Sequence, residues 1–390
     1  MPILFAPSPT SGMHIQVLES ASEMAALEEV WERLQASATS TSVFMSFSWQ
    51  ALWWRTYGAG RSLKLFVATA DGDVVGVLPL YLETVAVLRF PVRQLRLLGT
   101  GGDTSPDDLG PVFARGREVE VARALAEAVI ALRGWDVILF TDLLAEGPFP
   151  DTMEAALRAR RIAHRSGRSE RIVYMDLPAT WDAYLGSLSR DRRYRVRKLR
   201  KDLNAAAAAR FYRWDDPATL DEGVDRLVAL HRRRWQQAGE EHAFSSNAYV
   251  AFHRAVMHAC LKRDQLRLYA LDLDGKTIAM YYFYRFRDRV YLMQSGFDPD
   301  RAALKPGHVL LGYIIEQAIG EGFKVLDFLA GEHRYKDELA TGERQTVFIT
   351  ATGVGPGAWV FRLLHHVLPA LKGYVKAVLK RVPGQRRPAA

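Results

Sequence analysis

Two segments of this 390-residue chain share one pattern: an apolar alternating run, an Asp-Gly pair and a second apolar run. They read LKLFVATADGDVVGVLPLY at residues 63–81 and LRLYALDLDGKTIAMYYFY at residues 266–284. Asp-Gly between two such runs is a strong signal for a tight β-hairpin, because both residues accept the left-handed backbone that the turn needs. The chain is therefore expected to contain two antiparallel hairpins, one in each half.

The elements around the two hairpins are also expected in the same order. An aromatic-rich helical segment precedes each hairpin, and a strand, a helix and another strand follow it. These later elements are expected at 95–99, 118–133 and 135–143 in the first half and at 289–297, 308–321 and 323–331 in the second. The shared order favours duplication of one unit over coincidence. We predict an α+β fold with a mixed sheet, made of tandem domains at residues 1–170 and 171–352 and a tail at 353–390.

Composition narrows the class of protein. The single cysteine, Cys260, excludes an internal disulfide and a cysteine-built metal site. The histidines around 231–258 lack the spacing of metal ligands, so no metal is expected. The N-terminus does not resemble a signal peptide, and no apolar run is long enough to span a bilayer, so we expect a cytoplasmic protein. The formal charge of +8 permits an anionic partner and selects none.

The tail from Gly353 onward has its own pattern. Apolar residues recur at helical spacing, with Lys and Arg between them, and this predicts a basic amphipathic helix. One interpretation is a helix docked on the preceding domain. The other is an anchor that gives peripheral contact with the inner face of a membrane.

Four motifs in the second half carry a resemblance to a known family. They are RW-x3-G-x4-F (Arg234, Trp235, Gly239 and Phe244), QSGFDP at 294–299, KPGHVLL at 305–311 and DFLAGEHRYK at 327–336. Their order over residues 183–350 resembles the GNAT acyltransferases, in particular the CelD/BioF2-like branch that is related to the FemABX peptidyltransferases. The resemblance implies two GNAT-like halves, of which the first matches in outline and is expected to lack a cofactor site.

The resemblance implies acetyl-CoA or another acyl-CoA as co-substrate. A loop that opens a helix would then hold the pyrophosphate, with Lys305, Gly307 and His308 in that role. This loop has a proline and one glycine where the family usually has more glycines. The strand before it would hold the pantetheine arm and polarise the thioester through backbone near Met293, Gln294 and Ser295.

The stretch LDFLAGEHRYKDELA at residues 326–340 supplies ionisable groups at the end of a strand. Glu332 is the candidate general base for an amine acceptor, and Tyr335 a proton donor to the leaving thiolate. Lys336 would neutralise a phosphate or the oxyanion. Asp327, inside the strand, is either catalytic or a structural partner of Lys336 or Arg334. The alternative for each residue is a solvated salt bridge.

The densest charge run, SRDRRYRVRKLRKDL at 189–203, predicts a basic helix. Such a helix suits tRNA, an anionic lipid, a phosphorylated acceptor or a solvated face. The expected function is transfer of an acyl group to an amine or hydroxyl of a cell-envelope, polysaccharide or small-molecule acceptor. The alternatives are a Fem-type aminoacyl-tRNA-dependent transferase and a non-catalytic binding module in envelope polysaccharide biosynthesis. The Gly- and Asp-rich loop at 97–113 either lines an acceptor cleft between the halves or forms a long turn.

Overall fold

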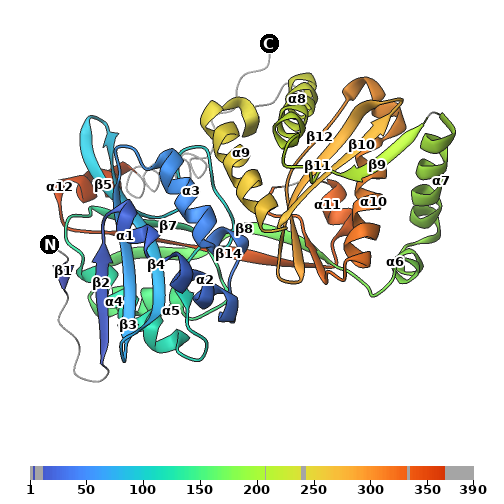
Figure 1. Cartoon of the computed structure of the whole chain (residues 1–390). Helices are drawn as coiled ribbons and strands as arrows, with labels where there is room; N and C mark the ends of the chain where they lie inside the picture. Colours follow the sequence, from blue (N-terminus) through green and yellow to red (C-terminus); the bar gives the residue numbers. More distant parts are fainter. Residues whose placement is uncertain (1–2, 5–11, 207, 239–242, 332–333, 365–390) are drawn as a thin grey trace, which may run out of the picture.

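The computed structural model describes residues 3–4, 12–206, 208–238, 243–331 and 334–364, which form one large mixed β-sheet with helices on both faces (Figure 1). The strands lie in the order β1-β2-β3-β4-β5-β7-β14-β8-β13-β12-β11-β10-β9, and β6 pairs with β4. Their bounds are β1 Ile3–Leu4, β2 Met13–Leu18, β3 Ser62–Ala70, β4 Asp73–Val87, β5 Phe90–Leu97, β6 Val112–Phe113, β7 Val137–Leu143, β8 Ala163–Asp176, β9 Ala209–Arg213, β10 Leu266–Leu273, β11 Lys276–Phe286, β12 Arg289–Phe297, β13 Val325–Asp327 and β14 Gly342–Thr352.

The helices alternate with these strands along the chain. Among the described residues, the α-helices are α1 Ala21–Ala25, α2 Glu28–Ser37, α3 Phe47–Tyr57, α4 Glu118–Ala131, α5 Phe149–Ala159, α6 Trp181–Ser187, α7 Arg190–Ala206, α8 Leu220–Ala238, α9 Asn247–Lys262, α10 Pro306–Gly320, α11 Arg334–Leu339 and α12 Pro356–Arg362. The 3-10 turns are η1 Val43–Met45, η2 Ala243–Ser245 and η3 Pro299–Leu304. No helix in these ranges is long and apolar enough to cross a membrane.

Both predicted hairpins are present. Strand β3 pairs with β4 and β10 pairs with β11, each around its Asp-Gly turn. All four turn residues have positive φ, 55° and 88° in the first turn and 50° and 76° in the second. Two consecutive positive φ angles are the mark of the type I′ turn, which matches the twist of the flanking strands.

The two halves repeat one order of elements and exchange their last strands. From β2 to β8 and from β9 to β14, the main elements follow one order: strand, helix, 3-10 turn, helix, hairpin, strand, helix, strand, helix and last strand. The first half adds the short helix α1 and strand β6 to this order, and the second half adds the 3-10 turn η3. Strand β8 pairs with β13 of the second half, and β14 pairs with β7 of the first. The two exchanged strands also pair antiparallel with each other, from Ala163↔Thr352 to Tyr174↔Gly342. The sheet is therefore continuous from one half to the other (Figure 1).

The two halves also share a buried core. One buried cluster contains residues of α3 and α9, including Trp49 and Phe252, whose ring centroids lie 5.0 Å apart in an edge-on contact. A second cluster lies between α10 and the opposite face of the second-half strands. Strand β11 is buried on both faces, which explains its nearly unbroken apolar sequence. The predicted tail begins with α12, and its residues 365–390 lie outside the described part of the chain.

Candidate functional site

The parallel strands β12 and β13 separate and leave a pocket. They pair over three residues only, from Arg289↔Val325 to Tyr291↔Asp327. Beyond this point β12 stays paired with β11, while the chain after β13 turns away. The pocket between them is lined by residues 292–295 of β12, residues 328–330 after β13, Tyr335 and Lys336 of α11, and three residues of α8, namely His231, Arg234 and Trp235. We call it the β12–β13 pocket.

A β-bulge shapes one wall of this pocket. Tyr282 pairs with Gln294 and Phe283 with Leu292, so Met293 is an extra residue between two ladder positions. Such a residue takes its backbone groups out of the regular ladder. The pocket is lined by all three residues that were predicted to bind the cofactor on this strand, namely Met293, Gln294 and Ser295.

Helix α8 lies directly against the bulged strand. A Cβ on Gly296 would lie 2.5 Å from the backbone nitrogen of His231, so only glycine permits this approach. The ring of His231 donates from Nδ1 to the carbonyl of Ser295 at 2.9 Å, and Arg234 Nη1 lies 3.3 Å from Ser295 Oγ. Helix α8 therefore holds the strand end and contributes a histidine and an arginine to the pocket.

Helix α11 supplies two ionisable groups that the sequence nominated. Burial raises the pKa of Tyr335 to about 12, so its hydroxyl keeps its proton at neutral pH. Lys336 is buried, and its Nζ donates to the carbonyls of Leu329 at 3.3 Å and Ala330 at 2.9 Å. Burial lowers the pKa of Lys336 to about 8. The lysine thus holds the pocket wall rather than pointing into solvent.

Asp327 is the centre of a buried ion cluster. Its Oδ2 accepts from Arg289 at 2.9 Å and from Arg344 of β14 at 2.7 Å, and its Oδ1 accepts from the backbone N–H of Leu329 at 2.9 Å. The last bond holds Leu329 at φ 55°, a left-handed conformation that costs a leucine about 1 kcal/mol. Asp327 therefore holds the pocket wall through its bond to Leu329, and its ion-pair partners are Arg289 and Arg344 rather than the expected Lys336 or Arg334.

Two acids reach this cluster from the Gly- and Asp-rich loop of the first half. Asp107 is buried and accepts from the N–H of Ala330 at 2.8 Å. Burial raises the pKa of Asp107 to about 8. Asp108 pairs with Arg344, and burial raises its pKa too. The backbone of Ala330 is thus held at two points: its N–H donates to Asp107, and its carbonyl accepts from Lys336.

The start of α10 offers few backbone donors. Pro306 has no N–H, and the N–H groups of His308 and Val309 both donate to the carbonyl of Lys305. Gly307 is the remaining donor of this turn. Burial and the neighbouring cations Lys305 and Arg195 lower the pKa of His308. The two cations Lys305 and Arg195 suit an anion that is bound mainly by side chains, although the acid Glu338 also lies near His308.

A groove runs from this point between α7 and α10. Leu199 of α7 and Val309 of α10 are among its apolar lining, Arg195 and His308 are polar, and Tyr335 belongs both to this groove and to the β12–β13 pocket. The basic run predicted a helix, and α7 confirms it. Arg200 stacks on Tyr313 at 4.1 Å and pairs with Glu316, so part of the charge run has structural partners.

The remaining predicted site residues lie outside the pocket or outside the described residues. Glu332 lies outside the described residues. Lys305 and Gly307 lie at the start of α10, away from the pocket walls. Among the described residues, no group of three or more His, Cys, Asp or Glu could hold a metal ion. Sequence reasoning missed His231 and Asp107. The spacing of His231, Arg234 and Trp235 on one helix face was an available signal for the first, whereas Asp107 requires the tertiary structure.

Comparison with known proteins agrees with this geometry. Residues 190–337 match the family described as acetyltransferase (GNAT) domain. The chain is similar to the structure of FemX, with 12% identity, coverage of 83% of this chain and 95% of the other, and a TM-score of 0.58. It is also similar to a protein of unknown function from Bacteroides thetaiotaomicron, with 11% identity, coverage of 86% of this chain and 100% of the other, and a TM-score of 0.53. The structure of L-PGS from Bacillus licheniformis has 11% identity, coverage of 90% of this chain and 96% of the other, and a TM-score of 0.50.

At these identities the structures show a shared fold. No curated protein sequence matches the chain. The resemblance drawn from the sequence motifs is confirmed, and residues 190–337 form a GNAT acetyltransferase domain of the CelD/BioF2-like family.

Proposed function

We propose that the protein moves an acyl group, acetyl in the simplest case, from acyl-CoA to an amine or hydroxyl by direct attack. The observation that supports this most is the pocket where β12 and β13 separate, next to the Met293 bulge. In this proposal, residues 1–170 and 171–352 are two GNAT-like domains, and the second carries the reaction.

The residues around the pocket fit the parts of such a donor. The thioester arm would lie along Met293–Ser295, with backbone N–H groups at the bulge facing the developing oxyanion. Lys305, His308 and Arg195 would face the phosphates. Tyr335, which keeps its proton at neutral pH, would donate to the departing thiolate, and Glu332 is proposed as the base for the acceptor. Asp107 and Lys336 would position the facing wall.

Calorimetry with acetyl-CoA tests donor binding, and release of free thiol in the presence of an amine panel tests transfer. Tyr335→Phe should bind the donor as the wild type does and release thiol about 10-fold or more slowly. Tyr194→Phe, on the exposed surface of α7, is the matched control and should change neither property. Absence of binding at millimolar acetyl-CoA would contradict the proposed donor.

A Fem-type aminoacyl-tRNA-dependent transferase is the second candidate. The basic helix α7, which lines the groove between α7 and α10, and the single backbone donor at the start of α10 favour it. In that case the protein would ignore acetyl-CoA and bind tRNA with a steep dependence on salt. The proposed acceptor for the first candidate is a saccharide or small molecule of the cell envelope.

A further inference from the structure

Exposed apolar side chains gather at one edge of the first half, around α12 and the tip of the β4–β5 hairpin. Trp359 of α12 and Leu88 of the tip are each 67% exposed, Phe90 is 54% exposed and Leu363 49%. We call these four residues the α12 patch. The described residues include two large exposed side chains far from it in sequence, Val119 on α4 and Tyr194 on α7. A cluster of this kind on a protein surface marks a contact site more often than chance.

The two segments of the patch are neighbours in space. Phe361, on the inner side of α12, is buried with Val92 of β5. A Cβ on Gly357 would lie 2.9 Å from the carbonyl oxygen of Pro91, the residue after Phe90. Helix α12 is thus docked on β5 by one face. Trp359 and Leu363, four residues apart, lie together on its outward face.

Cations surround the patch. Arg89 is exposed at the hairpin tip between the two apolar residues, and Arg362 lies over the Trp359 ring at 5.6 Å. The chain that continues from α12 contains no acidic residue after Glu343. It carries further cations at Lys372, Lys376, Lys380, Arg381, Arg386 and Arg387.

We propose that the α12 patch docks the protein on an anionic lipid surface. Tryptophan with arginine is the combination that favours the boundary between headgroups and acyl chains, and basic residues around an apolar face add attraction to anionic lipid. A second copy of the chain would bring Arg89 and Arg362 against the same cations of its partner. The chain's own tail is cationic as well. Charge complementarity therefore selects lipid over both, and this surface functions whatever group the acyltransferase domain transfers.

The test is co-sedimentation of the full chain with phosphatidylcholine vesicles that contain or lack phosphatidylglycerol. The wild type should pellet with the anionic vesicles and much less with the neutral ones. The double variant Phe90→Ser/Trp359→Ser should bind anionic vesicles about 10-fold more weakly. The matched control Val119→Ser/Tyr194→Ser removes two equally exposed apolar side chains elsewhere and should pellet like the wild type.

Three results would overturn the proposal. One is a wild type that stays in the supernatant with anionic vesicles. Another is a patch variant that pellets as well as the wild type does. The third is a patch variant that changes from dimer to monomer in size-exclusion chromatography, which would assign the patch to a second copy. Equal melting temperatures of both double variants and the wild type would support docking, because a patch covered by the chain's own tail would lose stability on mutation.

Discussion

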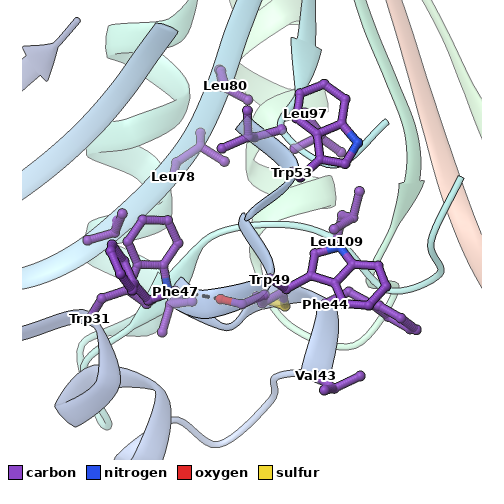
Figure 2. Packing of buried hydrophobic residues seen from close by; sticks show 14 of the residues in the cluster. Trp31, Val43, Phe44, Phe47, Trp49, Trp53, Leu78, Leu80, Leu97 and Leu109 are labelled. Atoms are coloured by element: carbon purple, nitrogen blue, oxygen red, sulfur yellow. Dashed lines mark hydrogen bonds between the residues drawn. The ribbon is translucent and has the colours of Figure 1, made fainter. Parts of the chain in front are cut away.

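The parallel strands β12 and β13 separate around a pocket, whereas the corresponding strands of the first half separate around a piece of their own chain. There, β5 pairs with β7 from Gln94↔Val137 to Arg96↔Leu139. Beyond these pairs, Leu109 lies beside the end of β7 in place of β5. Its N–H donates to the backbone carbonyl of Asp142, and its carbonyl accepts from the N–H of Leu144, each at 2.8 Å. Leu109 is buried in the same cluster as Phe44 and Trp49 (Figure 2).

The helices that follow these strands, α4 in the first half and α10 in the second, also begin with opposite charges. Helix α4 begins with Glu118, and the backbone N–H groups of Glu118 itself and of Gly116 lower the pKa of that carboxyl. Helix α10 begins after Lys305, beside His308 and Arg195. A carboxylate at a helix start occupies the place where a phosphate would bind. The charge at the start of α4 would repel an anionic donor, whereas the charge at the start of α10 would attract one, as the proposed function requires. The loop that fills the first half also sends Asp107 and Asp108 to the second.

The largest expected effect comes from comparing substitutions of two corresponding aspartates, Asp327 in β13 and Asp142 in β7. Asp327→Asn leaves Arg289 and Arg344 facing a neutral amide, and removing one partner of a buried pair costs about 3 kcal/mol. Asp142→Asn is the control, because Asp142 accepts from Ser105 and its φ of 58° suits asparagine. It should cost about 1 kcal/mol or less. Urea unfolding measures both, and equal losses would show that the arginine cluster does not distinguish the halves.

A second prediction concerns the contact of α8 with β12. Gly296→Ala places a methyl group 2.5 Å from the nitrogen of His231 and 2.8 Å from the carbonyl carbon of Leu230. Backbone atoms cannot rotate away, so α8 must shift, at a cost of about 2 kcal/mol. Gly320→Ala at the end of α10 meets nothing within 4 Å and should be neutral or slightly stabilising. Thermal unfolding of the two variants compares them, and similar melting temperatures would mean that α8 adapts without strain.

The sequence predicted the elements better than their partners. Asp-Gly turns and apolar alternation are local signals, so both hairpins and the order of elements could be read directly. A repeat was also present in detail, because DLLAEG at 142–147 resembles DFLAGE at 327–332, and Ser46 and Ser246 cap α3 and α9 alike. The exchange of β8 and β14 could not be read, since the choice of a neighbouring strand depends on contacts between distant residues.

The same limit applies to the site. Met293, Gln294, Ser295, Tyr335 and Lys336 follow from their place after recognisable elements, and the structure brings them to one pocket. The charges of Asp327 and Lys336 did not indicate which residues would pair with them or bond to them in the folded protein. Arg289 and Arg344 lie 38 and 17 residues from Asp327, and Asp107 is in the other half of the chain. A buried carboxylate must have compensating groups, and tertiary packing decides which.

A third prediction uses ligand binding to compare the two helix starts, and it assumes the proposed donor. Lys305→Gln should weaken acetyl-CoA binding about 10-fold, because it removes a cation beside the proposed phosphate position. Glu118→Gln removes the one negative charge of Glu118 at the start of α4 and should leave the affinity unchanged. Calorimetry gives both dissociation constants. A change caused by Glu118→Gln would place a donor site in the first half.

The last prediction tests how the first half supports the second through Asp107. The pKa of Asp107 is about 8 in the folded protein and near 4 when unfolded, so the folded state holds an extra proton between these values. The contribution of Asp107 to the free energy of unfolding is therefore fully present below about pH 4, and it is lost as the pH rises through about 8. Asp107→Asn keeps an oxygen for the Ala330 N–H and cannot ionise. From pH 5 to pH 8 the variant should therefore lose about 1 to 3 kcal/mol less than the wild type.

Asp107 raises the pKa of Lys336, so Asp107→Asn lowers that pKa further. A lysine with a lowered pKa gains stability as pH rises, which changes the comparison in the same direction. Asp103→Asn is the control, since Asp103 lies on the same loop and is exposed. It should leave the pH dependence of unfolding in urea as it is in the wild type. If Asp107→Asn also follows the wild-type curve, Asp107 ionises without cost, and the loop that fills the first half supports the pocket of the second by packing rather than by a neutral carboxyl held against Ala330.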